Sequence, residues 1–239
     1  MRIDDIQRNG YRIFQNPDVF CFGVDAVLLA HYVKVGRQCE RILDIGTGTG
    51  IIPILMHAIY QKGKYVGIDI QSDMIDMAKQ SVELNNIGND IAMECMDIKD
   101  FRLNFNRESF DVVTCNPPYM KGKAGLKNEN YSKTVARHEV ACSLEDIVEA
   151  ASFVLKEKGR LAFIHRAHRL VDILFLMRKY KVEPKRMRMV YPKLSKAPTM
   201  VLVEGIKYAN AELKVDRPLI VYNEDNTYTD EILEIYGRN

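Results

Sequence analysis

The sequence lacks several features that mark specialised classes of protein. No apolar run approaches the ~20 residues needed to span a membrane, and no secretory signal pattern stands at the start. The five cysteines are scattered, odd in number and without a Cys-x-x-Cys pair, which argues against a disulfide framework and a zinc site. We therefore expect a cytoplasmic protein with no metal, no membrane association and no obligate protein partner.

The composition that remains is typical of a globular protein. Apolar residues make up 47% and charged residues 28% of the 239 positions, enough for a large core. Residues 11–14 and 20–22 predict short strands or a hairpin, and Asp25 predicts the N-cap of a helix. We expect one principal domain over residues 37–239, preceded by a lead-in over residues 1–36.

Charge is distributed unevenly along the chain. The net charge is +2, yet residues 156–196 hold 13 lysines and arginines against three acids, a local charge of +10. Positive charge gathered at one end of a molecule suits a polyanionic partner such as nucleic acid. A solvated basic surface gives the same pattern, so charge alone leaves both interpretations open.

A glycine-rich loop, Gly46-Thr47-Gly48-Thr49-Gly50, stands between a predicted strand at residues 41–45 and a predicted helix at residues 51–58. Glycines let the backbone approach a ligand, and the helix N-terminus presents unpaired N–H groups there. The third glycine comes one residue too early for Gly-x-Gly-x-x-Gly, and no Lys-Ser or Lys-Thr follows. The spacing therefore disfavours a dinucleotide site and excludes a P-loop.

Two further predicted strands end near acids, residues 65–70 with Asp69 and residues 91–98 with Asp97. An aspartate at the end of the second strand can accept hydrogen bonds from both hydroxyls of a ribose. A loop or capping acid is the alternative for Asp69. Spacing alone leaves the role of Asp97 open.

The motif Asn116-Pro117-Pro118-Tyr119 follows an apolar run over residues 110–115. Proline gives no N–H to a sheet and fixes its own φ, so the strand must end in a stiff loop, at the edge where open α/β sheets bind ligands. An amide oxygen, a backbone carbonyl and an aromatic ring suit a planar group that carries an NH2. A plain proline turn is the alternative.

The second half of the chain predicts a loop and the remaining elements of an α/β sheet. Residues 120–137 carry five basic residues against one acid and predict either a lid for a phosphate backbone or an ordinary solvated loop. Arg137-His138-Glu139 lacks a matching nucleophile or metal-ligand spacing, which favours a role in anchoring this loop. Helices are expected at residues 144–155, stopped by Lys158-Gly159, and at 170–177, strands at 160–165, 186–191 and 200–206, and a short packed tail after them.

The order of these motifs resembles that of class I S-adenosylmethionine-dependent methyltransferases acting on exocyclic amines, and more closely the bacterial family of tRNA(Val) adenine-N6 methyltransferases. The likeness includes residues 22–29, 137–139 and 201–205 and so covers most of the chain. It implies a doubly wound, Rossmann-like α/β fold whose seven-stranded sheet is mostly parallel with an antiparallel last strand. It also implies S-adenosylmethionine as methyl donor, a tRNA substrate, and methylation of adenine N6 beside the anticodon by a catalytic domain at residues 37–239.

The resemblance also implies roles for particular residues. Asn116 and Pro117 would accept the two amino hydrogens of the base, and Tyr119 would stack on its ring. The residues implied for the cofactor are Asp44, Gly46, Thr47, Gly48, Gly50, Asp69, Ile70, Asp97, Ile98 and Asn116. The residues expected to bind RNA are Lys121, Lys123, Arg137, Arg166, Arg169, Arg186 and Arg188.

The same amine geometry serves other substrates. Methylation of a glutamine side chain in release factors, or of another amine on an RNA or DNA base, stays open, although the basic stretch favours RNA. The glycine spacing counts against a dinucleotide oxidoreductase. The intact motif at residues 116–119 counts against a cofactor-binding module without catalysis.

Overall fold

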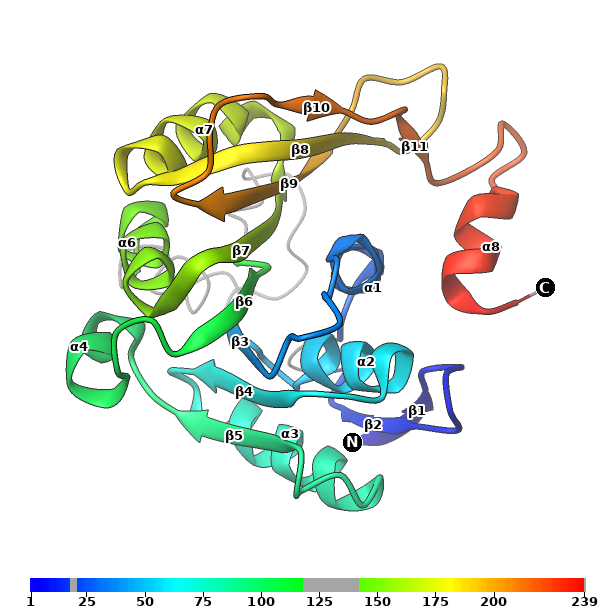
Figure 1. Cartoon of the computed structure of the whole chain (residues 1–239). Coiled ribbons are helices and arrows are strands. Elements are labelled where there is room, and N and C mark those ends of the chain that lie inside the picture. Colours follow the sequence, from blue (N-terminus) through cyan, green and yellow to red (C-terminus); the bar gives the residue numbers. More distant parts are fainter. Residues whose placement is uncertain (18–20, 118–141, 239) are drawn as a thin grey trace.

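A central sheet with helices on both faces forms the protein in the computed structural model (Figure 1). The structure describes residues 1–17, 21–117 and 142–238. Within them the central sheet has nine strands in the order β10-β8-β9-β7-β6-β3-β4-β5, with β11 paired to β8. These strands are β3 (Arg41–Ile45), β4 (Lys64–Asp69), β5 (Ile91–Cys95), β6 (Phe110–Cys115), β7 (Leu155–Arg166), β8 (Val182–Tyr191), β9 (Met200–Lys207), β10 (Lys214–Val215) and β11 (Leu219–Ile220).

The seven longer strands form the sheet that the sequence predicts. β3, β4, β5, β6 and β7 run parallel to their neighbours in this group, whereas β9 is antiparallel to both β7 and β8. The doubly wound α/β fold is therefore confirmed. β10 and β11 extend the edge beside β8 by two residues each, too few to show a strand period, and we expected only a packed tail there.

Helices bury the two faces of the sheet in two hydrophobic clusters. α1, α2 and α3 cover one face, and α6 and α7 cover the other. α6 begins with a capping box, in which the Ser143 hydroxyl accepts from the Asp146 N–H and the Asp146 carboxylate accepts from the Ser143 N–H. The helices are α1 (Val24–Tyr32), α2 (Ile51–Tyr60), α3 (Ser72–Leu84), η1 (Ile98–Asp100), α4 (Phe101–Asn104), α6 (Leu144–Val154), η2 (Ala167–Arg169), α7 (Leu170–Lys179) and α8 (Asp230–Tyr236).

Two local expectations were wrong, and one helix in the packed tail was not foreseen. Gly23 is the N-cap of α1, and Asp25 lies in the first turn instead. No stop separates α6 from β7, because Leu155 ends the helix and begins the strand, while residues 156–159 bulge where β7 shifts register against β6. The tail contains α8, whose seven residues give too few turns for a clear helical period.

The N-terminal lead-in contains a hairpin followed by α1, but only its second strand was expected, and residues 21–22, expected in a strand, are in none. β1 (Arg2–Asp5) pairs antiparallel with β2 (Arg12–Gln15), and β2 lies on α3 through a 2.9 Å bond from the Phe14 N–H to the Ser81 hydroxyl. Arg8 donates to the Glu234 carbonyl of α8 at 2.8 Å, so the two ends of the chain meet. No helix in the described part of the chain is long and apolar enough to cross a membrane.

Candidate active site

Three adjacent strands end at one level and create the site. Ile45, the last residue of β3, pairs with β4 on one side and with β6 on the other. Gly46, Asp69 and Asn116 therefore lie side by side at the carboxyl edge of the sheet. Ligands bind at this edge in open α/β folds.

The loop over this edge depends on glycine conformations. Gly46, Gly48 and Gly50 have φ values of 71°, 54° and 81°, which residues with a Cβ rarely adopt. A Cβ added to Gly46 would meet nothing within 4 Å, whereas one added to Gly50 would lie 2.6 Å from the Met93 side chain. Gly46 thus borders open space that a ligand can occupy, and Gly50 lets the loop pack against the core.

Asp69 is buried and holds the glycine loop in place. Its Oδ2 accepts from the Gly48 N–H at 2.9 Å, and its Oδ1 accepts from the Gln71 N–H at 3.0 Å. The Asp69 carboxylate therefore stabilises the loop, which is the structural role given above as the alternative to ligand binding. Oδ1 also accepts from the Gln71 side-chain amide at 3.4 Å, whereas Oδ2 accepts one bond among the described residues and can still accept from a ligand hydroxyl.

Asp44 lies beneath the loop, and its Oδ1 accepts from the Thr114 hydroxyl at 2.6 Å. Burial raises the pKa of Asp44 to about 7, and the bond from Thr114 opposes that rise. Three buried atoms here, Asp44 Oδ2 and the hydroxyls of Thr47 and Thr49, make no hydrogen bond of ordinary geometry within the described residues, although Thr47 lies close enough to Asp44 to oppose the rise of its pKa. Such atoms are rare inside proteins, so the site has capacity for a polar ligand.

The ends of β4 and β5 add an apolar surface and an acceptor. The Met96 N–H donates to the Asp69 carbonyl at 2.9 Å, which brings these two strand ends together. Ile70 is 44% exposed, while Ile98 is buried. The half-buried Asp97 caps the short helix η1 through its side chain. An exposed isoleucine near a carboxylate suits a flat ring that carries an amino group.

Asn116 and Pro117 follow β6 directly, the first half-buried and the second buried. They lie beside the glycine loop because β6 adjoins β3. The structure thus brings the predicted amine-binding residues and the predicted cofactor residues to one place. Tyr119, Lys121, Lys123 and Arg137 lie outside the described residues.

Two polar residues near the site were missed from the sequence. Thr114 is buried inside the apolar run of β6, where it binds Asp44. His165 is buried near the end of β7, and its Nδ1 accepts from the Arg166 N–H at 2.8 Å. Burial, with the nearby charge of Arg169, lowers the pKa of His165 to about 4, so its imidazole is neutral at pH 7. A single polar residue within an apolar strand is the signal that could have found both.

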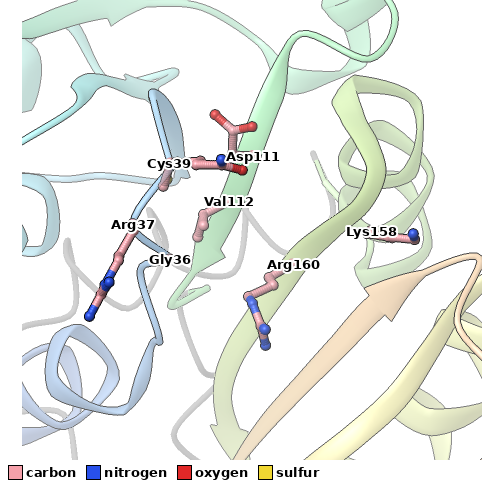
Figure 2. A pocket seen from close by; sticks show the side chains of 8 residues that line it. Gly36, Arg37, Cys39, Asp111, Val112, Lys158 and Arg160 are labelled. Atoms are coloured by element: carbon pink, nitrogen blue, oxygen red, sulfur yellow. The ribbon is translucent and has the colours of Figure 1, made fainter.

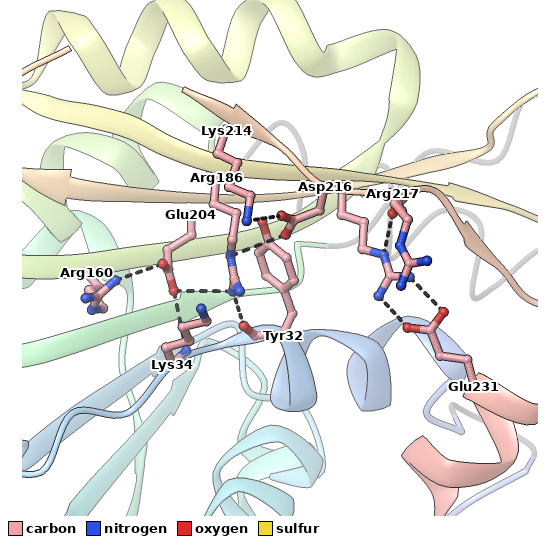
Figure 3. A network of polar contacts seen from close by, with 10 residues as sticks. Tyr32, Lys34, Arg160, Arg186, Glu204, Lys214, Asp216, Arg217 and Glu231 are labelled. Carbon is pink, nitrogen blue, oxygen red and sulfur yellow. Dashed lines mark hydrogen bonds and ion pairs between the residues drawn. The ribbon is translucent and has the colours of Figure 1, made fainter. Parts of the chain in front are cut away.

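The basic residues expected to bind RNA divide between two places. Arg166 ends β7 and Arg169 lies in η2, both at the carboxyl edge. Arg186 and Arg188 lie in β8 and are used internally (Figure 3). The Arg186 guanidinium stacks 3.9 Å from the centre of the Tyr32 ring, and Arg188 makes two 2.7 Å bonds to a carboxylate of α8. These two side chains are not brought to the site.

A hollow of about 440 Å³ lies at the opposite, amino end of the strands (Figure 2). Arg37, Cys39, Asp111 and Arg160 are among its lining residues, and none of the predicted site residues is. Asp111 is already bound there by Lys156 at 2.8 Å. In the described segments no group of three or more His, Cys, Asp and Glu could hold a metal ion.

Comparisons with known proteins agree with this geometry. Residues 37–204 match the family described as "Methyltransferase domain". A curated tRNA1(Val) (adenine(37)-N6)-methyltransferase of Porphyromonas gingivalis is 28% identical, covering 89% of this chain and 86% of that protein. Proteins of the same name from Haemophilus influenzae and Trichodesmium erythraeum are 26% and 28% identical over 94% of this chain and 93% and 92% of their own lengths.

Solved structures show the same fold. A predicted O-methyltransferase from Agrobacterium tumefaciens superposes with a TM-score of 0.71 at 23% identity, covering 90% of this chain and 96% of that one. A geranyl diphosphate C-methyltransferase from Streptomyces coelicolor, in complex with S-adenosyl-L-homocysteine, gives a TM-score of 0.56 at 13% identity over 76% and 78% of the two chains. The family match covers more than two thirds of the sequence, and the chain belongs to the methyltransferase domain family.

Proposed function

We propose that the protein transfers a methyl group from S-adenosylmethionine to N6 of adenine in tRNA, in valine tRNA beside the anticodon. The observation that carries this proposal is the position of Asn116 at the end of β6, directly beside the glycine loop on β3. The substrate class comes from the names of the relatives, whose own lengths are covered to 86% or more by the match to this chain.

The residues at the edge fit S-adenosylmethionine. Open space above Gly46 admits a ligand close to the backbone, and the buried polar side chains of Asp44, Thr47 and Thr49 lie beneath the loop that would hold it. Asp69 can accept from the ribose hydroxyls, while Ile70 and Asp97 can contact the adenine ring and its amino group. When bound, this cofactor supplies an electrophilic methyl group.

The protein contributes position and hydrogen-bond acceptors to the reaction. The side-chain oxygen of Asn116 and the carbonyl of Pro117 would accept the two hydrogens of the target amine and hold its nitrogen lone pair towards the methyl group. No general base is needed for attack, because the proton leaves after the nitrogen has become cationic. The target base must leave its stack to reach this edge, and Tyr119 would stack on it.

The same proposal covers organisation and location. Residues 1–36 would be the lead-in and residues 37–239 the catalytic domain, with tRNA as partner. Five free cysteines and a tRNA substrate suit a cytoplasmic enzyme.

Label transfer tests the proposal. The protein is incubated with S-adenosylmethionine labelled in its methyl group and either total bacterial tRNA or a purified release factor. We expect label in tRNA and none in the release factor. Label in the release factor alone would retain the cofactor assignment and replace adenine with a glutamine side chain, and label in neither would contradict the proposed function.

A further inference from the structure

The basic stretch at residues 156–196 does not form one end of the molecule. β7, α7 and β8 cross between the two edges of the sheet, so the 13 basic residues of this stretch are spread over both edges. More than half of these cations form ion pairs within the chain, namely Lys156, Arg160, Arg169, Arg178, Lys179, Arg186 and Arg188. The net charge counted along residues 156–196 is therefore larger than the positive charge available at the surface to bind a polyanion.

One group of basic residues nevertheless lies at the edge that carries the site. We call it the corner strip: Arg166, His168, Arg169, Lys193 and Lys196. A 3.1 Å bond from the Ala167 N–H to the Thr199 carbonyl joins the corner after β7 to the loop at residues 192–199. β7 adjoins β6, and Phe163 of β7 pairs with Cys115, the last residue of β6. Arg166, the first residue of the strip, therefore lies three residues beyond the level at which β6 ends.

The loop at residues 192–199 is held in shape by several bonds. The Lys196 N–H donates to the Lys193 carbonyl at 3.1 Å, and the Lys193 ammonium donates to the Glu224 carbonyl at 2.8 Å. The Ser195 hydroxyl donates to the Glu224 carboxylate at 3.0 Å. The loop contains no acid, and Lys196 is exposed. Its cations are thus presented on a fixed support, which lowers the entropy lost on binding.

The chemistry of the strip fits unpaired RNA. Lysine and arginine bind phosphates, and the Leu194 side chain, 74% exposed between the two lysines, offers an apolar contact for the face of an unstacked base. Asp172 pairs with Arg169 at 2.6 Å, which reduces the charge that Arg169 offers. The loop lysines form no carboxylate ion pair in the described residues. Lys193 lies close enough to Asp225 to lower the pKa of that carboxyl, whereas Lys196 is exposed.

We propose that the corner strip binds backbone phosphates of the tRNA next to the target adenine, with Lys193 and Lys196 as its main contacts. This inference rests on the proposed function and names the surface that holds its substrate. It separates these lysines from Arg186 and Arg188, whose charges are satisfied inside the protein.

The test compares two double variants of the full chain with equal loss of charge. Lys193→Gln with Lys196→Gln alters the strip, and Arg37→Gln with Lys158→Gln alters the hollow at the opposite edge (Figure 2). The tRNA dissociation constant is measured at several salt concentrations, and thermal unfolding confirms that both variants fold. We expect the strip variant to flatten the slope of log Kd against log salt by about 1.5 to 2, and the hollow variant to leave it unchanged.

Each other outcome has a definite meaning. If wild-type protein methylates tRNA but the strip variant keeps its full salt slope, the strip does not bind phosphate and the inference fails. Equal flattening by both variants would also overturn it, because the effect would then be one of net charge. Absence of methyl transfer by the wild type would contradict the proposed function instead.

Discussion

Asn116 combines the two properties that a residue binding an amino group requires, an acceptor oxygen and a fixed position. Its position comes from β6, which ends one residue earlier between β3 and β7, and from Pro117, whose ring fixes the backbone next to it. Neighbouring strands thus fix a side chain that carries no charge. The catalytic contribution of this residue should therefore be large and specific.

Asn116→Ala is predicted to lower the turnover number by about 100-fold or more, because it removes a well-placed hydrogen bond in the transition state. Methyl transfer is measured at saturating tRNA and S-adenosylmethionine. Asn106→Ala changes an exposed asparagine before β6, at the opposite edge, and should leave turnover unchanged. Near-normal turnover of Asn116→Ala would rule out the amine-binding role.

Asp44 gives the free protein a pH dependence of stability. Burial raises its folded pKa to about 7, whereas the unfolded value is near 3.9. The folded state therefore binds a proton that the unfolded state has lost, and this contribution to stability disappears as pH rises through 7. We predict that it lowers the free energy of unfolding by about 2 to 3 kcal/mol between pH 5 and pH 8.

Asp44→Asn should remove that decline, which urea unfolding of the cofactor-free protein at the two pH values would measure. Other groups titrate equally in both proteins, so the difference between their two declines isolates Asp44. Identical declines in the wild type and the variant would show that Asp44 does not retain its proton on folding.

At the scale of elements, a buried ionic network attaches α1 to the second half of the sheet (Figure 3). Glu204 of β9 is 2% exposed and accepts from Arg160 of β7 at 2.8 Å and from the Lys34 N–H after α1 at 3.4 Å. Arg186 of β8 lies 3.8 Å from the same carboxylate and stacks on Tyr32 at the end of α1. One carboxylate therefore connects three strands and a helix.

Glu204→Ala is predicted to destabilise the protein by about 3 kcal/mol, because the partly buried Arg160 loses its counter-charge and Arg186 keeps only Asp216, at 3.8 Å. Glu231→Ala breaks the more exposed pair with Arg188 and should cost about 1 kcal/mol or less. Urea unfolding of both variants checks the difference. Equal losses would mean that the Glu204 network is no more important than a surface ion pair.

Elements with a strong local signal were predictable from the sequence. Loop glycines at positive φ, the proline stop after β6 and the apolar strands each follow from local chemistry, and they place Asp44, Asp69 and Asn116 at one edge. Arg186 could not be assigned, because its stacking partner Tyr32 is 154 residues away in the chain. Long-range ion pairs of this kind leave no mark in a local pattern.

At the scale of the whole molecule, the two edges of the sheet differ in chemistry. The carboxyl edge holds the glycine loop, the residues proposed to bind the amine and the corner strip, while the amino edge holds a hollow partly lined by residues already in ion pairs. The chain ends join at Arg8 and α8. Cofactor, target base and flanking phosphates are thus all assigned to one edge, as methyl transfer between them requires.

The most direct test uses two tRNA transcripts that differ at one base. Valine tRNA is compared with the same transcript carrying guanine in place of the adenine beside the anticodon, and N6-methyladenosine is measured by mass spectrometry after digestion to nucleosides. We predict about one N6-methyladenosine per molecule of the first transcript and none in the second. Equal methylation of both, or of neither, would contradict the assignment of adenine N6 as the target.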